Sequence, residues 1–370
     1  MQTYRVRITP SSAFGSRPLG DTLFGQLCWA ARNRHGEGRI AELLAGYTEG
    51  RPWAVVSDAL PTGYLPRPSL PGHWFAEAAG EDRKAIKKRA WFPVDSPTFV
   101  PVEDWLAHCR PATEVPGSAP QANPQPHNTI NRMTGTTGEG QFAPYSMGRL
   151  WYGAGSRVGA GLARDDSRES SAVREISESD QSRPGAAPTN IAPPIRLDVY
   201  VVLDESRLSR DELRQLFEDI GAFGFGRDAS IGLGKFQVIA VETFAWPRPT
   251  DANAYLTLAP CAPQGQGFDP ERSFYQTFTR FGRHGDIGVH LGNPFKTPVL
   301  LAQTGAVFSP CLAGEGPGVR AFIGQGLGGN GLLSKAIEGT VHQGYAPVVG
   351  IRLPSPQPSA AGRGSDLEVA

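Results

Sequence analysis

The chain has no excess of either charge, because 36 lysines and arginines balance 36 aspartates and glutamates among its 370 residues. This excludes a protein that coats nucleic acid through positive charge spread over its whole surface. Lysine is scarce, since it supplies only six of the 36 basic residues. The arginine-rich balance suits bidentate binding of phosphate and equally fits a GC-rich genome. We therefore expect any polyanionic partner to be bound at a local site.

Cysteine is also scarce, and the four cysteines form no C-x-x-C pair; they are Cys28, Cys109, Cys261 and Cys311. Their spacing excludes a zinc knuckle and a dense disulfide framework, and it indicates reduced thiols in a cytoplasmic protein. No stretch approaches 18 consecutive apolar residues, and the N-terminal segment MQTYRVRITP has no apolar leader. We expect a soluble protein without a membrane segment.

Catalytic motifs are missing too. The sequence contains neither G-x-S-x-G nor H-E-x-x-H, and its seven histidines are scattered without metal-ligand spacing. We therefore predict no metal and no cofactor. His35 could act as a general base in RNA cleavage, and Asp21 could help to activate a ribose 2′-hydroxyl. Their simpler interpretations are a surface residue and a helix cap.

Glycine and proline are abundant, with 45 and 33 residues, which excludes an all-helical protein and predicts long loops. Residues 2–9 alternate between apolar and polar side chains, as in a half-buried strand. After a turn-rich segment, residues 21–33 carry one apolar stripe and predict a helix with Asp21 as its N-cap. Residues 53–57 predict a second strand.

The middle of the chain, from about residue 60 to 195, lacks clear periodicity and predicts a large insertion. Residues 127–146 favour a hairpin. Residues 157–188 are polar with few large apolar side chains, which predicts disorder. An extended hairpin with an apolar residue could splay the bases of single-stranded RNA, although an ordinary surface hairpin explains the pattern as well.

Periodicity returns at residues 197–203, which predict a strand. Residues 209–221 predict a helix with a capping box from Ser209 to Glu212 and Gly221 as its terminal glycine. Residues 235–243 predict another strand. Together with the first elements this gives the split βαβ pattern of a ferredoxin-like domain over residues 1–246.

A second unit is predicted over residues 247–354, with strands within 254–260, 297–308 and 346–354. Residues 355–370 are small and polar and predict a disordered tail. The sequence thus predicts an α+β protein of two ferredoxin-like (RRM-like) domains, with a large loop and hairpin insertion in the first.

A glycine-rich loop, FGFGRDASIGLGKFQV at residues 223–238, is the most informative local feature. Its backbone N–H groups could hold phosphate oxygens, with Arg227 and Lys235 beside them. The G-x-G-x-x-A match at 224–229 follows a helix and precedes a strand, which is the wrong order for a dinucleotide site. A long turn between helix and strand is the competing interpretation.

A second glycine motif, GQGLGG at residues 324–329, precedes the helix-like segment 331–339. A nucleotide-dependent oxidoreductase could use such a motif, but it needs an acidic residue about 20 positions further on. After Glu338 the next acid is Asp366. We therefore interpret GQGLGG as a tight loop.

The first forty residues are locally basic, with six arginines against Asp21 and Glu37. We predict that five of these arginines gather on the open face of the first sheet, beside the glycine-rich loop, and bind RNA there; they are Arg5, Arg7, Arg17, Arg32 and Arg34.

Five segments, taken in order, resemble the RAMP superfamily of CRISPR effector subunits, and more narrowly its Cas-five group, the type that forms subunit four of type III-A Csm complexes. They are GDTLFGQLCWA at 20–30, HNTINRMTGTTGEGQFAPYS at 127–146, IGLGKF at 231–236, TPVLLAQTGAVF at 297–308 and HQGYAPVVGI at 342–351. The resemblance implies two ferredoxin-like domains and a subunit that grips the 5′ handle of crRNA without nuclease activity. It also implies packing against the large polymerase-like subunit and the first backbone RAMP subunit.

The resemblance also implies site residues. The handle contacts would be Gly226, Arg227, Ser230, Gly232, Gly234 and Lys235, and a projecting thumb would carry Asn131, Arg132, Met133, Thr134 and Gly135. Asp21 would be structural. The alternative function is a RAMP endoribonuclease that processes precursor crRNA with His35 as general base.

Overall fold

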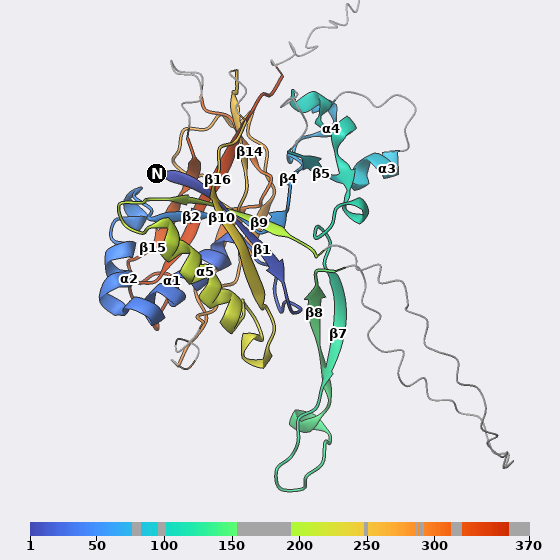
Figure 1. The fold of residues 1–370 in the computed structure, drawn as a ribbon, viewed down its shortest axis with the longest axis vertical. Helices are drawn as coiled ribbons and strands as arrows, with labels where there is room; N and C mark the ends of the chain where they lie inside the picture. The colour runs from blue at the N-terminus through green and yellow to red at the C-terminus, as the bar shows by residue number, and fades with distance from the viewer. Residues whose placement is uncertain are drawn as a thin grey trace, which may run out of the picture.

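The structure is a computed structural model, and it describes residues 1–75, 83–94, 101–153, 194–247, 251–285, 288, 290, 292–311 and 320–354. The predicted disordered segments, 157–188 and 355–370, lie outside the described residues. The described part is α+β, with several antiparallel sheets and few helices, as the sequence predicts (Figure 1).

The first sheet is built from segments at both ends of the long insertion. Its strand order is β10-β1-β9-β2, and β3 (Leu60–Pro61) pairs with β9 at the same edge as β2. The strands are β1 (Gln2–Pro10), β2 (Ala54–Val56), β9 (Leu197–Leu203) and β10 (Phe236–Thr243). Helix α1 (Gly20–His35) connects β1 to β2, and α5 (Arg210–Phe223) connects β9 to β10. This order is the βαββαβ pattern of a ferredoxin-like unit.

Local sequence explains these elements. In β1 the side chains of Tyr4, Val6 and Ile8 are buried against the helices, whereas the intervening arginines face the other side. Helix α5 has the predicted capping box, in which the Ser209 hydroxyl accepts from the Glu212 N–H and the Glu212 carboxylate accepts from the Ser209 N–H.

Two predicted helix ends are wrong. Leu19 is the N-cap of α1, and Asp21 lies in its first turn, because Asp21 turns inward to an ion pair with Arg280. Gly224 ends α5, and Gly221 lies inside its last turn. A Cβ at Gly221 would lie 2.3 Å from the Phe236 carbonyl oxygen, so this glycine lets the helix approach β10 closely.

The insertion forms its own small elements. A three-stranded sheet of β4 (Tyr64–Pro66), β5 (Arg89–Pro93) and β6 (Arg110–Pro111) lies beside α3 (Arg83–Lys88) and α4 (Trp105–His108). Strands β7 (Gln121–His127) and β8 (Tyr145–Trp151) form a hairpin that projects from the body (Figure 1). The remaining short helices are α2 (Glu37–Leu44) and the 3-10 turns at 47–49, 72–74, 102–104, 112–114, 140–142 and 229–231.

The C-terminal half is a second antiparallel sheet of order β14-β11-β16-β15. Its strands are β11 (Ala254–Thr257), β14 (Val307–Phe308), β15 (Phe322–Gly328) and β16 (Val341–Ile351), and β12 (Thr277–Arg280) pairs with β13 (Val299–Ala302) in a separate ribbon. The described residues from 251 to 354 include no α-helix. The second ferredoxin-like domain therefore stays a prediction.

The predicted tight loop GQGLGG is instead part of strand β15. Gly324 has φ +93, and a Cβ there would lie 2.1 Å from the Gly344 carbonyl oxygen of β16. The glycines allow close strand pairing rather than a nucleotide loop. The following residues 331–339 are irregular and not helical.

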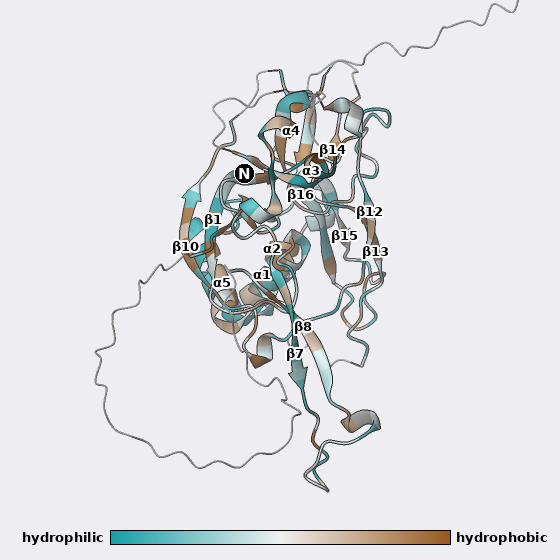
Figure 2. Ribbon diagram, turned by 90° about the vertical axis from the view of Figure 1, so that its right-hand side faces the viewer, coloured by the Kyte–Doolittle hydropathy of each residue, from teal (hydrophilic) through white to brown (hydrophobic). Residues whose placement is uncertain are grey.

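The main core lies between the first sheet and α1 and α5, and it includes Phe24, Trp53, Phe217 and Tyr345. Strand β9 is buried along its whole length, because its other face packs through Tyr200 on a second core that includes Leu256 and Val349. In Figure 2, brown apolar stretches are visible on α1 and α2, and also on β10 at the edge of the view. The described helices include none long and apolar enough to cross a bilayer.

A buried polar cluster joins the two halves. Asp58 accepts hydrogen bonds from the Gly20 N–H at 2.7 Å and the Thr304 hydroxyl at 2.6 Å. Burial raises the pKa of Asp58 to about 7, and these two hydrogen bonds oppose the rise. Burial lowers the pKa of His342 to about 4, against the opposing effect of the Asp21 carboxylate. The folded state therefore favours the neutral form of both groups.

The two groups act on stability in opposite directions as pH changes. Asp58 has a raised folded pKa, so its contribution is complete below about pH 4 and is lost as pH rises through about 7. His342 has a lowered folded pKa, so its contribution grows as pH rises from about 4 to 6.5. The wild-type profile should therefore be shallow across this window.

Asp58→Asn should remove one of these opposing effects. Relative to wild type, the free energy of unfolding of the variant is expected to rise by about 3 kcal/mol between about pH 4.5 and 8. Urea unfolding at both pH values measures this difference. His342→Gln is the matched control, and its stability relative to wild type should fall over the same interval. A constant difference between Asp58→Asn and wild type would contradict the assignment.

Candidate nucleic-acid interface

The glycine-rich loop leads from the end of α5 to the start of β10 and lies at the surface. The side chains of Arg227, Ser230 and Lys235 are exposed, whereas Phe225 and Gly234 are buried. The loop is therefore a surface feature with a buried base, and its cationic side chains are available to a ligand.

Two glycines of this loop use their N–H groups for hydrogen bonds within the protein. The Gly234 N–H donates to the Ala13 carbonyl at 2.7 Å, and the Gly232 N–H donates to the Ala229 carbonyl at 2.9 Å. These two N–H groups are therefore not free to hold phosphate, contrary to the predicted cradle. Gly226 and Gly234 have φ +75 and +74 and pack so closely that a Cβ would overlap Ser16 or Phe225.

The turn-rich segment between β1 and α1 lies against this loop. The N–H groups of Ser11 and Ser12 donate to the Lys235 carbonyl, and the Ser12 hydroxyl accepts from the Lys235 N–H at 2.9 Å. The Ser16 hydroxyl accepts from the Arg227 N–H at 3.4 Å. These contacts place the exposed Arg17 in the same region as the loop.

The foot of the hairpin completes the arrangement. Phe14 and Leu150 exchange two backbone hydrogen bonds, each of 2.8 Å. The Arg227 guanidinium donates to the Gly148 carbonyl of β8. The glycine-rich loop, residues 11–17 and the hairpin foot therefore meet; this arrangement is called the three-loop junction below.

Charge at the three-loop junction is positive. Arg17 and Lys235 form no ion pair with the described residues, whereas Arg227 lies 3.2 Å from the carboxylate of Asp228. Three cations and one anion leave a local excess of two positive charges. Burial raises the pKa of the adjacent Tyr152 to about 12, and the positive charge of Arg17 opposes this rise. Such a local excess suits a polyanion.

The hairpin differs in detail from the prediction. Its paired strands are 121–127 and 145–151, so the predicted segment 127–146 is mostly the tip rather than the arms. At the tip the Asn131 side chain accepts from the Met133 N–H at 2.9 Å, and the Thr134 and Thr136 hydroxyls are 2.9 Å apart. Arg132 is exposed, and Met133 is 96% exposed. The tip therefore presents an apolar side chain beside a cation.

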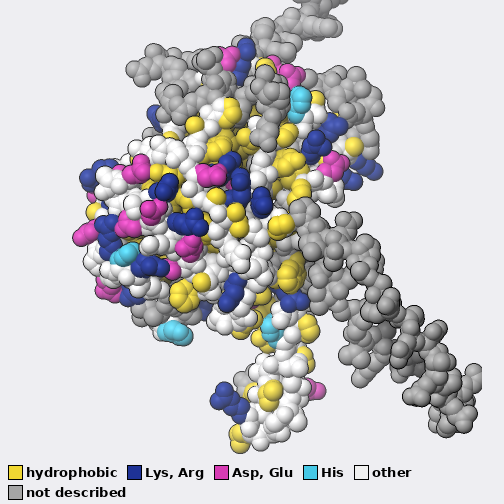
Figure 3. Space-filling view, viewed as in Figure 1, with side chains coloured by type: hydrophobic (Ala, Val, Ile, Leu, Met, Phe, Trp, Pro, Cys, Tyr) yellow, Lys and Arg dark blue, Asp and Glu magenta, His cyan; other side chains and the backbone are white. Residues whose placement is uncertain are grey.

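The predicted gathering of N-terminal arginines is wrong in part. Arg5 pairs with Glu242 and Arg7 with Asp198 on one face of the first sheet, whereas Arg34 pairs with Asp219 on the helical side. Arg32 pairs with Glu37 near the end of α1, about 20 Å of helix away from the three-loop junction. Figure 3 shows both signs of charge interspersed over the body. Only Arg17 of this group lies at the junction.

The candidate catalytic residues do not come together. His35 is exposed in the last turn of α1, whereas Asp21 is buried in its first turn. Among the described residues no three His, Cys, Asp or Glu side chains are grouped so as to hold a metal. All four cysteines are free thiols.

Sequence reasoning missed the residues that hold the junction together. In the sequence these residues look like ordinary turn, apolar and strand residues, because their partners are more than 70 positions away; they are Ser12, Phe14, Ser16 and Gly148. The turn-rich composition of residues 10–20 was the only local signal.

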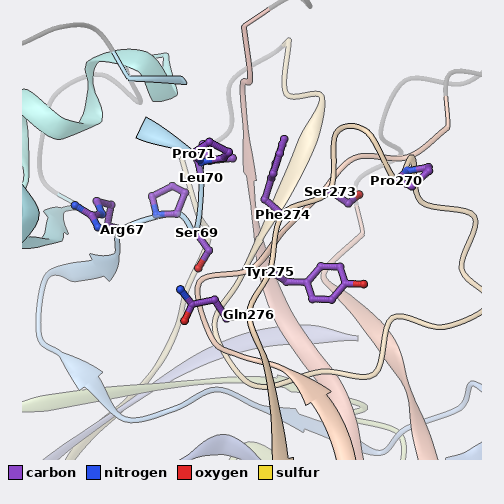
Figure 4. A pocket seen from close by; sticks show the side chains of 10 residues that line it. Arg67, Ser69, Leu70, Pro71, Pro270, Ser273, Phe274, Tyr275 and Gln276 are labelled. Carbon is purple, nitrogen blue, oxygen red and sulfur yellow. The ribbon is translucent and has the colours of Figure 1, made fainter. Parts of the chain in front are cut away.

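A separate cleft of about 640 Å³ lies between residues 67–71 and 270–276. Figure 4 shows Arg67 and Ser69 on one side and Phe274 and Tyr275 on the other, with Gln276 below Ser69. Prolines form much of its lining, and the Tyr275 ring points away from Arg67. The cleft is distinct from the three-loop junction and shares none of its residues.

Comparison with solved structures identifies the fold. A chain of the Csm1–Csm4 cassette bound to pppApA is similar with a TM-score of 0.53 and 14% identity, over 96% of this chain and 99% of that chain. A chain of the cassette bound to AMPPNP is similar with a TM-score of 0.53 and 15% identity, over 96% of this chain and 100% of that chain. A chain of the Csm3–Csm4 subcomplex of a type III-A CRISPR-Cas interference complex is similar with a TM-score of 0.52 and 10% identity, over 95% of this chain and 100% of that chain.

Csm4 is the component common to these assemblies, so the fold of this chain is Csm4-like, and the predicted resemblance is confirmed at the level of the fold. No protein-family model and no curated protein matches the sequence.

Proposed function

We propose that this chain is a non-catalytic RNA-binding subunit of a type III CRISPR effector complex. In that complex it would hold and cap the 5′ handle of crRNA and join the large polymerase-like subunit to the backbone RAMP subunits. The Csm4-like fold and the three-loop junction support this proposal. The junction combines exposed cations with a projecting hairpin, and both suit a single strand of RNA.

The residues of the proposed RNA site would have different physical roles. The charges of Arg17, Arg227 and Lys235 would contact phosphates, and the exposed Ser230 hydroxyl could reach a ribose or a phosphate. Gly226, Gly232 and Gly234 would hold the loop in shape. Asn131, Arg132, Met133 and Thr134 would form the tip of a thumb whose apolar side chain packs against unstacked bases. Arg32 would lie outside this site.

The double variant Arg227→Ala/Lys235→Ala tests the proposal. It should bind labelled single-stranded repeat RNA about tenfold more weakly, and the slope of log affinity against log salt should become shallower by about 1.4, because two phosphate contacts are lost. Fluorescence anisotropy at several salt concentrations measures both quantities. Lys235→Ala alone leaves the hydrogen bond from Arg227 to the hairpin intact and should show about half of the change in slope.

Arg210→Ala/Arg214→Ala is the matched control, since it removes two exposed arginines from α5. This control should bind RNA as wild type does. Equal affinity of the wild type and the Arg227/Lys235 variant would contradict the RNA site. The same RNA should remain uncut during the assay, whereas site-specific cleavage lost in His35→Ala would support the endoribonuclease instead.

A further inference from the structure

The ribbon of β12 and β13 carries an exposed apolar face that the proposed RNA site does not use. Residues alternate along β12, so that Tyr275, Thr277, Thr279 and Phe281 are exposed while Arg280 turns inward to Asp21. Across the ribbon Leu300 pairs with Thr279. The ribbon therefore has one buried side and one side open to solvent.

The open side is strongly apolar. Five of its large side chains are between 48% and 76% exposed, namely Tyr275, Phe281, Phe295, Leu300 and Leu332. The segments that carry them are neighbours, because Phe295 forms a β-bridge with Arg283 and the Thr297 hydroxyl donates to the Leu332 carbonyl at 2.7 Å. This surface, called the ribbon face below, is the kind of patch that marks an interaction site.

The charge of the ribbon face indicates which class of partner it binds. Residues 273–285 and 292–302 contain no aspartate or glutamate. Their cations are Arg280, which pairs with Asp21, Lys296, which is partly buried, and Arg283, whose guanidinium carbon lies 5.7 Å from the Phe295 ring centre. One exposed cation neutralises too few phosphates to hold RNA. Aromatic and aliphatic side chains with one arginine instead match the centre of a protein interface.

The position of the ribbon face in the molecule favours one protein partner over another. In Figure 2, β12 and β13 lie at the opposite edge of the molecule from β10, the strand into which the glycine-rich loop leads. A backbone subunit that bound the same guide RNA would be expected to dock near the RNA site. The ribbon face is remote from that site and suits a subunit that binds without the guide. Folds similar to this chain occur in binary Csm1–Csm4 cassettes.

We infer that the ribbon face docks the large Csm1-type subunit through an apolar surface of that subunit that places a carboxylate opposite Arg283. This inference rests on the proposed function and adds the surface and its chemistry. Phe281 and Leu300 are the central anchors, and the cleft behind Tyr275 lies at one end of the face.

The test uses the full-length chain with the large subunit and the backbone subunit encoded beside it. Phe281→Ser/Leu300→Ser should weaken binding to the large subunit by about tenfold or more in biolayer interferometry. Binding to the backbone subunit and to repeat RNA should not change. Arg283→Glu, which leaves the apolar anchors in place, should also weaken binding to the large subunit. Ile239→Ser on β10 is the control, because Ile239 is an exposed apolar residue on another face.

Three outcomes would overturn the inference: wild-type affinity of the double variant for the large subunit, loss of the backbone subunit alone, or a wild-type homodimer that the double variant dissolves. Unfolding curves of the variants establish that the fold is kept. Failure of the RNA site would appear only in the Arg227/Lys235 experiment, so the two proposals are tested separately.

Discussion

Gly234→Ala is expected to lower the free energy of unfolding by about 3 kcal/mol or more and to abolish RNA binding at the three-loop junction. The residue has φ +74, and a Cβ there would lie 2.1 Å from the Phe225 carbonyl oxygen and 2.5 Å from its nitrogen. The substitution adds left-handed strain to an overlap with backbone atoms that cannot rotate away. Because the Gly234 N–H also donates to Ala13, the strain reaches the segment that carries Arg17.

Gly232→Ala separates the cost of the left-handed backbone conformation from the cost of the overlap with backbone atoms. Gly232 has φ +92, but a Cβ there meets nothing within 4 Å. Its substitution should therefore cost only about 1 kcal/mol, the strain of the backbone conformation alone, and should leave RNA binding close to wild type. Chemical denaturation and RNA anisotropy on both variants make the comparison. Equal destabilisation by the two substitutions would show that the close packing of the loop on Phe225 is not important.

Arg280→Met is expected to destabilise the protein by about 3 kcal/mol, because it leaves the buried carboxylate of Asp21 without its counter-ion. Arg280 contacts Asp21 through two nitrogens, at 2.7 and 3.1 Å, and also donates to the Thr22 hydroxyl. The Asp21 side chain has no solvent exposure, whereas that of Arg280 is 25% exposed. The pair ties the start of α1 to β12, which carries the ribbon face.

The double variant Asp21→Asn/Arg280→Met is the decisive comparison. It removes both charges, so it should recover most of the stability that Arg280→Met loses. A double-mutant cycle by urea unfolding measures the coupling. Additive losses would indicate that the two groups act independently, and the structural role assigned to Asp21 would then be wrong.

A chain with no net charge can still present a polyanion site, because the distribution of charge matters more than its sum. Most arginines of the first forty residues are neutralised by carboxylates brought from other parts of the chain, as in the pairs Arg7–Asp198 and Arg34–Asp219. Arg17 and Lys235 escape such pairing within the described structure. The site therefore depends on which cations folding leaves unpaired.

The ribbon face illustrates the same point for apolar side chains. The segment TPVLLAQTGAVF reads as a strand with a continuous apolar run. Whether Leu300 or Leu301 faces the core depends on the pairing of β13 with β12, since neighbouring side chains point to opposite faces. Folding buries Leu301 and leaves Leu300 more than half exposed.

The sequence by itself determined the elements whose signals are local. The alternation of β1, the apolar stripe of α1 and the capping box of α5 each involve residues within a few positions of one another, and all three are present. Only the tertiary structure decided the ion-pair partners of the arginines, the inward turn of Asp21, the strand at GQGLGG and the junction of Arg227 with the hairpin. Most of these depend on contacts between residues that are distant in the sequence, such as Arg227 and Gly148, 79 positions apart, and Arg280 and Asp21, 259 positions apart, and no local pattern encodes such contacts.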